Sequence, residues 1–242
     1  MIDGQHDRFK DVAWYNQAKA ARPIIGGAGG IGSWLTLLLA RTGMQPIVFD
    51  YDRFEPHNMS GQFVAQSQIG MSKVEALADN AALYAGSDIV TFDQKYERGS
   101  MAGNYMLSGF DNMEARKHMF ESWCNYNRYA LDATRRRSSR WFASSEPIFI
   151  DGRLTLEQIQ IFCVTRDDNR VAEYRDKHLF DDKEVKDEEC TLKQTSHTAA
   201  IIAGMMTSFL TNHMVNIKEN SLAREVPFFT EYFLPLNHME CS

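Results

Sequence analysis

A glycine-rich segment near the start of the chain restricts the possible folds more than any other feature. The apolar residues 23–25 lead into Gly26-Gly27-Ala28-Gly29-Gly30-Ile31-Gly32, and residues 31–42 then follow a helical pattern. Dinucleotide-binding folds use a strand, a tight glycine turn and a helix in this order, because the turn approaches phosphate closely and the helix N-terminus attracts the anion. The segment therefore predicts a nucleotide-binding unit, although a glycine turn alone does not identify the nucleotide.

Strands and helices alternate through the first half of the chain. Helical spacing of apolar residues predicts helices at 31–42, 72–84 and 113–127. Short apolar runs predict strands at 24–27, 46–49, 88–92, 105–109 and 129–131. This alternation predicts an α/β fold with a Rossmann-like, mostly parallel sheet and helices on both faces.

The second half of the chain has a different pattern. We expect strands at 148–151, 158–164 and 227–233, which continue the sheet as a mixed or antiparallel C-terminal half. A long helix carries one apolar stripe, which belongs either to the core or to a dimer interface: Ala199, Ile202, Met206, Leu210 and Met214. The basic run at 135–140 and the charged run at 181–189 are expected to be solvated loops.

No internal repeat or linker divides the sequence. We therefore predict one domain over residues 1–242, with a nucleotide-binding half at about 22–132 and a crossover loop and C-terminal half at about 133–242.

Composition narrows the classes of partner and compartment. The chain of 242 residues has a formal net charge of −6, which gives no support to a nucleic-acid partner. The longest near-apolar stretch, residues 198–210, is too short and too polar to span a bilayer, and no secretory signal is evident. The four cysteines form no C-x-x-C pair, so we expect no zinc site, no disulfide framework and a cytoplasmic location with reduced thiols.

Three charged residues follow expected strands or begin a helix near the glycine turn. Asp50 ends the second strand about 20 residues beyond the glycines, where a carboxylate accepts hydrogen bonds from ribose hydroxyls of NAD or of ATP. Lys73 begins a helix and is either a polyphosphate contact or a solvated lysine. Asp111 follows the strand at 105–109 and is a candidate ligand for Mg²⁺ and a candidate N-cap of the next helix; both roles can coexist on Asp111 or be shared with Asn112.

Four motifs in this order resemble the ThiF/MoeB/HesA family, the adenylating core that is shared with ubiquitin-activating enzymes. They are G-x-G-G-[IL]-G at 27–32, D-x-D-x-x-x-x-x-N-[LM]-x-x-Q at 50–62, the lysine at 73 and D-N-x-x-x-R at 111–116. A weaker match continues through 150–153 and 158–164.

The resemblance implies an ATP-dependent adenylyltransferase. Members of the family bind ATP and Mg²⁺, and the C-terminal carboxylate of a ubiquitin-like protein or peptide attacks the α-phosphorus to give an acyl-adenylate and pyrophosphate. Catalysis then requires neutralisation of two approaching anions. The residues implied to bind the nucleotide, its phosphates or Mg²⁺ are Gly27, Gly29, Gly30, Gly32, Asp50, Asp52, Asn58, Gln62, Lys73, Asp111 and Asn112, with Asp111 as the Mg²⁺ ligand.

The sequence departs from the family pattern at Gly61 and in its cysteines, and Arg8 is the candidate for one further family feature. Gly61 stands where members usually have an arginine before the glutamine, so an inactive, nucleotide-binding adaptor is a second hypothesis. Many members supply an N-terminal arginine across a homodimer, and Arg8 is the candidate here. The zinc-binding C-x-x-C pairs of the family are absent, so no zinc is expected.

A third hypothesis, an NAD-dependent oxidoreductase, leaves the motifs at 58–62 and 111–116 unexplained.

Cys190 is the candidate nucleophile. The run Cys-Thr-Leu-Lys at 190–193 is similar to the segment around the thioester cysteine of ubiquitin-activating enzymes. A thiolate at a helix start would have a lowered pKa and could receive the acyl group from AMP. Asp187, Glu188 and Glu189 would instead raise that pKa, so a plain loop cysteine is the alternative.

Overall fold

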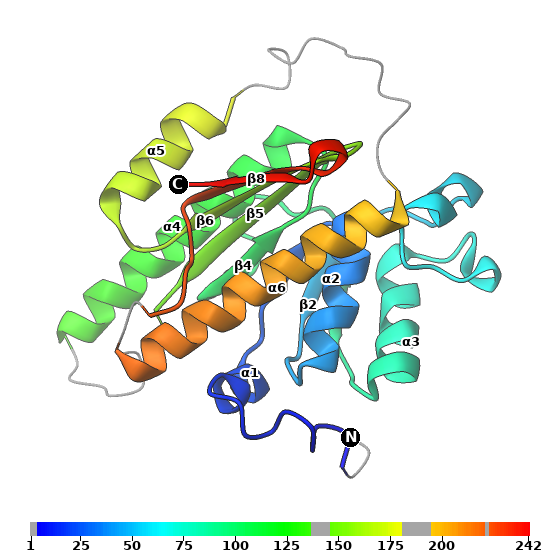
Figure 1. Ribbon diagram of the computed structural model, residues 1–242, viewed down its shortest axis with the longest axis horizontal. Helices are drawn as coiled ribbons and strands as arrows, with labels where there is room; N and C mark the ends of the chain where they lie inside the picture. Colours follow the sequence, from blue (N-terminus) through cyan, green and yellow to red (C-terminus); the bar gives the residue numbers. More distant parts are fainter. Residues whose placement is uncertain (1–3, 137–145, 181–194, 221–222) are drawn as a thin grey trace.

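The computed structural model describes residues 4–136, 146–180, 195–220 and 223–242, with only the backbone of the helix described for residues 129–136. Its centre is an eight-stranded sheet in the order β3-β2-β1-β4-β5-β6-β7-β8 (Figure 1). The strands are β1 (Ile24–Gly26), β2 (Ile47–Asp50), β3 (Val90–Asp93), β4 (Tyr105–Ser108), β5 (Ile148–Thr155), β6 (Gln158–Val164), β7 (Phe229–Phe233) and β8 (His238–Cys241).

The first five strands of the chain are parallel, and the last three join them in antiparallel pairs. β1 lies between β2 and β4, so the chain builds the sheet outward from its middle, first to one side and then to the other. β6, β7 and β8 extend the β5 side in antiparallel fashion. This arrangement confirms the Rossmann-like sheet with an antiparallel C-terminal continuation. Sheets of this kind bind ligands in the crevice outside the carboxyl ends of the strands at which the order reverses, which are β1 and β4 here.

Helices cover both faces of the sheet and bury two separate cores. One core joins Ile25 and Ile150 of the sheet to α2 and α6. The other joins Phe149 to Trp123 and Tyr174. The helices of the first face are α1 (Tyr15–Ala20), α2 (Gly30–Arg41), α3 (Lys73–Ala85) and α6 (Ser196–Glu219), and those of the second are α4 (Met113–Arg136) and α5 (Asp168–His178). In Figure 1, α6 crosses the sheet diagonally beside α2.

The apolar stripe of α6 belongs to the core. Its five predicted members, Ala199, Ile202, Met206, Leu210 and Met214, have no exposed surface in the single chain. Gly152 of β5 accommodates this helix, because a Cβ there would lie 2.6 Å from the Met206 sulfur. Core packing therefore explains the stripe, which provides no dimer surface.

The sequence-based prediction was wrong at residues 129–131 and missed three elements. No strand forms there, because α4 continues without interruption from Met113 to Arg136. The short helix α1, the polar helix α5 and the exposed strand β8 were not predicted. α5 buries only Tyr174 completely, so it lacks an apolar stripe, but the cap by Asp167 was a readable signal.

Several predicted segments fall outside the described residues. These are residues 137–140 of the basic run, all of the charged run at 181–189, and Cys190. Within the described part of the chain, no helix combines the length and apolar character needed to cross a membrane.

Two glycines are required by close packing where the chain passes from β1 into α2. A Cβ on Gly32 would lie 1.7 Å from the carbonyl oxygen of Gly27, and a Cβ on Gly26 would lie 2.3 Å from the Phe110 ring. Gly27 itself has φ +87°, a conformation that favours glycine. The glycine pattern therefore specifies the fold at this point independently of any ligand.

We expect Gly32→Ala to destabilise the protein by about 2 kcal/mol or more, because its new Cβ would meet backbone that cannot move aside cheaply. Gly29→Ala is the matched control, since nothing lies within 4 Å of a Cβ built there, and its effect should stay within about 0.5 kcal/mol. Urea denaturation followed by tryptophan fluorescence measures both changes. Equal stability of the two variants would contradict the packing argument.

Candidate functional site

The glycine turn brings the N-terminus of α2 to the crevice beside β1 and β4. The first backbone hydrogen bond of α2 runs from the Ser33 amide to the Gly29 carbonyl at 2.9 Å. The amides of residues 30–32 therefore have no intrahelical acceptor. The space beside Gly29 is open, and no contact within the described chain requires a glycine there. This turn has the backbone donors and the room that a phosphate group needs.

Asp50 faces this turn from the end of β2. Its Oδ2 accepts the Ala28 amide at 2.6 Å, and its Oδ1 accepts the Asp52 amide at 2.8 Å. Burial raises the pKa of Asp50, and the nearby Lys73 ammonium opposes that rise. Each carboxylate oxygen keeps a further lone pair, so the group could still accept hydrogen bonds from a ribose.

Lys73 lies beside Asp50 and is buried. Its Nζ forms an ion pair with Asp52 Oδ2 at 2.9 Å, and its amide donates to the Asp52 carbonyl at 2.9 Å. The residue is 7% exposed, whereas the side chain of Asp52 is 48% exposed. A solvated lysine is therefore excluded. The structure holds a positive charge at the start of α3, close to the carboxylate that ends β2.

The polar residues between Asp52 and Lys73 differ in their contacts. The Asn58 side chain accepts the Glu55 amide at 2.9 Å and caps the short helix η1 (Pro56–Ser60), so its side-chain oxygen stabilises the turn. Gln62 is buried, and its Oε1 has no partner among the described residues. The hydroxyls of Ser72 and Ser108, next to Lys73 and at the end of β4, are buried without described partners too. Three polar groups in these segments therefore remain available to a ligand or to water.

Gly61 occupies a position that the protein itself holds tightly. Its carbonyl accepts the Trp34 indole N–H at 3.1 Å, and the neighbouring Phe63 amide donates to the Ser33 hydroxyl at 2.9 Å. Arg53 is the only arginine in the sequence between β2 and α3; it is exposed and donates to the Gly70 carbonyl at 3.0 Å. The described contacts of Arg53 thus give it a role in the loop between β2 and α3.

Asp111 and Asn112 follow β4 and have different roles. The Asn112 Oδ1 accepts the Ala115 amide at 2.9 Å, which makes Asn112 the cap of α4. Asp111 is exposed and accepts a 3.3 Å hydrogen bond from the Asn112 amide group. In the described ranges, no three His, Cys, Asp or Glu side chains form a metal site by themselves. A single carboxylate that acts together with phosphate oxygens is a common way to hold Mg²⁺.

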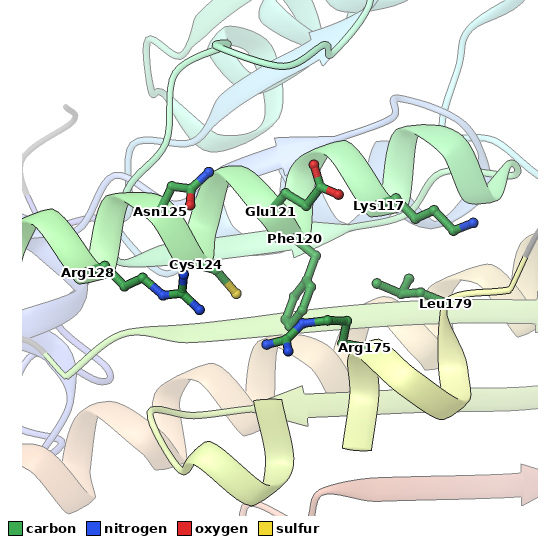
Figure 2. Close-up of a pocket in the computed structure, with 8 residues that line it drawn as sticks. All are labelled: Lys117, Phe120, Glu121, Cys124, Asn125, Arg128, Arg175 and Leu179. Carbon is green, nitrogen blue, oxygen red and sulfur yellow. The ribbon is translucent and has the colours of Figure 1, made fainter. Parts of the chain in front are cut away.

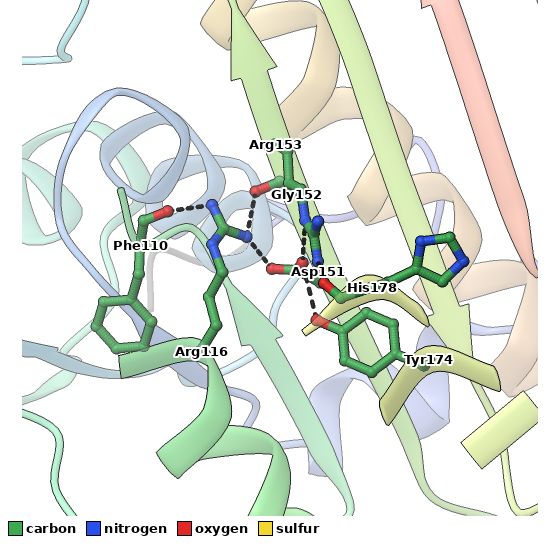
Figure 3. Close-up of polar contacts among 7 residues, drawn as sticks. All are labelled: Phe110, Arg116, Asp151, Gly152, Arg153, Tyr174 and His178. Atoms are coloured by element: carbon green, nitrogen blue, oxygen red, sulfur yellow. Dashed lines mark hydrogen bonds and ion pairs between the residues drawn. The ribbon is translucent and has the colours of Figure 1, made fainter. Parts of the chain in front are cut away.

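A buried ionic network supports the loop that carries Asp111 (Figure 3). The Asp151 carboxylate has no exposed surface and binds the guanidinium groups of Arg116 and Arg153 and the Tyr174 hydroxyl. Burial opposes ionisation, but the two arginines keep the pKa of Asp151 below its usual range. Arg116 also donates to the Phe110 carbonyl. Sequence analysis did not identify this network, although an aspartate inside an apolar strand was a visible signal.

Arg8 is not part of this arrangement in one chain. It is exposed, and its neighbours Gln5 and His6 contact residues at the opposite end of the sheet, namely Ala85 and the glycines at 43 and 86. Those glycines precede β2 and β3, whereas Asp50 ends β2. In the described chain Arg8 therefore lies at the end of the sheet opposite to Asp50.

Burial raises the pKa of two of the described cysteines. Burial raises the pKa of Cys124 to about 11, although Arg175 and Arg128 lower it in part. Cys163 is completely buried, which raises its pKa further. Cys241 is exposed on β8 and has no cationic partner among its described contacts. The predicted nucleophile Cys190 lies outside the described residues.

A cavity of about 390 Å³ lies between α4 and α5 (Figure 2). Its lining includes Phe120 and Leu179 together with the cationic side chains of Lys117, Arg128 and Arg175. The cavity shares no residue with the glycine turn or with the polar groups around Lys73. The candidate site is therefore an open crevice at the end of the sheet and is distinct from this cavity.

Comparisons with known proteins agree with the fold and the motifs. The sequence model of the ThiF family matches residues 5–241. Ubiquitin-like modifier-activating enzyme 5 of Culex quinquefasciatus is 34% identical over 129 residues, which cover 45% of this chain and 32% of that protein. The same enzyme of Caenorhabditis elegans is 32% identical over 127 residues, which cover 45% and 30%. The chain thus spans about a third of the length of these curated relatives.

Solved structures with low sequence identity share the fold. PaaA aligns with a TM-score of 0.66 and 15% identity, over 98% of this chain and 68% of that chain. A structure of Escherichia coli MccB with ATP aligns with a TM-score of 0.67 and 12% identity, over 100% and 71%. Other structures of that protein contain MccA. These alignments confirm the Rossmann-like architecture.

We expect Asp151→Asn to lower the free energy of unfolding by about 3 kcal/mol at neutral pH, because two buried arginines would lose their carboxylate. The acid dependence should also change. The lowered native pKa means that the unfolded state binds more protons below about pH 4, so this stabilisation is present above that pH and is lost as the pH falls. The variant should therefore lose stability less steeply on acidification.

Urea denaturation over a pH series measures this effect. Asp7→Asn, at an exposed carboxylate on the surface, is the control and should keep the wild-type slope. A slope for Asp151→Asn that equals the wild-type slope would show that the carboxylate is not held ionised by its two arginines.

Proposed function

The chain belongs to the ThiF family, and we propose that it is an ATP-dependent adenylyltransferase. Its substrate would be the C-terminal carboxylate of a ubiquitin-like protein or a peptide. The curated relatives are named ubiquitin-like modifier-activating enzymes, and solved structures of the MccB protein contain ATP or MccA. These names support the proposal, while the described chain supplies the chemical reason for it.

The observation that carries the proposal is the buried Lys73 next to Asp50. A dinucleotide oxidoreductase would use the glycine turn and Asp50, but it has no need of a buried ammonium group at this position. A polyphosphate does, because Lys73 presents a point charge near the helix N-termini of α2 and α3. Because Lys73 is buried, its electrostatic attraction to a phosphate group is stronger than it would be in water. ATP therefore fits these residues better than NAD does.

The described residues fit a nucleotide in further respects. The turn is open at Gly29, and the buried oxygens of Gln62, Ser72 and Ser108 lack described partners. We propose that the amides of residues 30–32 and Lys73 contact the phosphates, that Asp50 accepts the ribose hydroxyls, and that Asp52 orients Lys73 through its ion pair. Asn58 would act indirectly, since its side chain caps η1.

The reaction requires two anions to approach each other. A carboxylate oxygen of the substrate forms a bond to the α-phosphorus, and the bond from that phosphorus to the bridging oxygen breaks. The products are an acyl-adenylate and pyrophosphate. Lys73 and the α2 N-terminus lower the electrostatic cost of this approach, and the crevice aligns the reacting groups.

Mg²⁺ is part of the proposal, with Asp111 as the protein ligand. The ion would neutralise phosphate charge when bound and would complete its coordination with phosphate oxygens and water. The exposed position of Asp111 at the end of β4 is compatible with this role, and Asn112 would hold its carboxylate through their hydrogen bond.

The later steps and the assembly are proposals as well. The Cys190 thiolate would attack the carbonyl carbon of the acyl-adenylate, form a thioester and release AMP, whereas Cys124 and Cys163 are buried thiols with raised pKa values. The protein would act as a homodimer in which Arg8 of one copy reaches the site of the other. We further propose that residues 1–242 form one adenylation domain of a cytoplasmic protein, without zinc, nucleic acid or membrane as a partner.

A second candidate function is a nucleotide-binding adaptor of the same family without activity. Gly61 favours it, because the usual arginine is missing and Arg53 donates elsewhere. An adaptor would bind ATP and the carboxylate partner without pyrophosphate release, so ATP–pyrophosphate exchange in the presence of the partner separates the two functions.

We expect Lys73→Met to weaken ATP binding by roughly 10- to 100-fold, because it removes a charge-assisted hydrogen bond worth about 1.5–3 kcal/mol. Methionine keeps the apolar stem that the site buries. Lys177→Met, at an exposed lysine paired with Glu173, is the control and should bind ATP as the wild type does. Isothermal titration with ATP measures both, and wild-type affinity of Lys73→Met would refute the phosphate contact.

Cys190→Ala tests the thioester. We expect this variant to keep ATP–pyrophosphate exchange with its substrate and to lose the adduct that reducing agents release, because adenylation precedes thiol attack. Cys241→Ala is the control at an exposed thiol. Non-reducing gel electrophoresis detects the adduct, and its persistence in Cys190→Ala would exclude Cys190 as the acceptor.

A further inference from the structure

We propose that Arg116 is a positioning residue for the metal site, and that it acts by holding the loop that carries Asp111. This inference rests on the proposed function, in which Asp111 binds Mg²⁺. Arg116 is 5% exposed, although its chain segment starts at the edge of the crevice. Its guanidinium group donates to three acceptors in two separate parts of the chain: the Phe110 carbonyl after β4, and the Asp151 carboxylate and the Gly152 carbonyl of β5, the last at 3.1 Å.

The bond to Phe110 is the one that connects Arg116 with the site (Figure 3). The Phe110 carbonyl and the Asp111 amide belong to the same planar peptide group. The orientation of this carbonyl therefore fixes the position of the Asp111 backbone. The loop is also held before and after this point. The Gly109 amide donates to the Gly26 carbonyl at 2.9 Å, and Asn112 caps α4. None of these contacts uses the Asp111 carboxylate itself, which leaves it available to a metal ion.

Asp151 makes this role of Arg116 possible. An arginine buried without a counter-charge would be costly, and the carboxylate of Asp151 supplies that charge from β5. The planar guanidinium then reaches backbone carbonyls on both sides of the ion pair at once. A lysine would keep the charge but donates from one nitrogen, whereas Arg116 reaches Phe110 with one terminal nitrogen and Asp151 and Gly152 with the other.

Arg153 provides a matched comparison within the same network. It binds the other oxygen of Asp151 at 2.8 Å, and it donates to the His178 carbonyl at 2.7 Å. Its guanidinium lies 4.7 Å from the centre of the Phe162 ring. No described contact joins Arg153 to the loop at 109–112. Loss of either arginine should therefore weaken the ion pair, but only loss of Arg116 should release the loop.

The first test is hydrogen exchange of the free protein, which requires no ligand. Arg116→Lys and Arg153→Lys are compared with the wild type, and the readout is exchange of the amides at 109–115. We expect faster exchange there in Arg116→Lys than in Arg153→Lys. Equal rates in the two variants, after correction for their global stability, would overturn the positioning role.

The second test measures how much Mg²⁺ tightens ATP binding, by titration with ATP in EDTA and in MgCl₂. Residues that orient a metal ligand typically contribute about 10- to 100-fold to metal affinity. We expect Arg116→Lys to require about 10-fold more Mg²⁺ than the wild type, with unchanged ATP affinity in EDTA. Arg153→Lys should keep the wild-type Mg²⁺ requirement. An equal shift in both variants, or no shift in Arg116→Lys, would overturn the proposal.

The two tests separate this inference from the proposed function. If Mg²⁺ has no effect on ATP binding by the wild type, the metal assignment of Asp111 has failed, and the role of Arg116 toward the metal fails with it. Faster exchange of the loop in Arg116→Lys would then still show that Arg116 holds Phe110. If the wild type responds to Mg²⁺ and Arg116→Lys responds equally, only the present inference is wrong.

Discussion

The close approach of α2 to β1 is the constraint on which the rest of the structure depends. The helix contacts the strand so tightly that Gly32 has no room for a Cβ beside the Gly27 carbonyl. This contact fixes the direction of the α2 N-terminus at the carboxyl end of β1. It also fixes the place of α6, which packs beside α2 and against β5. One pair of glycines therefore determines both the geometry of the crevice and the arrangement of the first core.

Two ion pairs of different kinds then hold the groups on either side of that crevice. Lys73 and Asp52 form a pair that is open to solvent on the carboxylate side, so a ligand can exchange with part of that interaction. Asp151 and Arg116 form a pair that is buried on both sides. This buried pair adds little net stability, but it is costly to break, so it holds its two residues in one conformation. In the proposed function the first pair presents charge to the nucleotide, and the second pair holds the loop that carries Asp111.

Sequence analysis predicted most of the sheet because apolar runs and glycine turns are local signals. It could not tell whether Lys73 is buried, since burial depends on how the segment between β2 and α3 folds back. It also could not see that Asp151 would meet Arg116 and Tyr174, which are far apart in sequence. The strand predicted at 129–131 failed because α4 simply continues, and α5 was missed because it buries little apolar surface. Local patterns thus predicted elements, while contacts between distant segments determined the site.

Thermal unfolding of the wild type with ATP, with ATP and Mg²⁺, and with NAD tests whether the protein is an ATP-binding adenylyltransferase. Ligand at about 100 times its dissociation constant adds roughly 2.7 kcal/mol of stability, which corresponds to an increase of about 5–10 °C in the unfolding midpoint. We expect the unfolding midpoint to rise by this amount with ATP, to rise further with ATP and Mg²⁺, and to stay unchanged with NAD. Stabilisation by NAD that is independent of Mg²⁺, without stabilisation by ATP, would contradict this expectation.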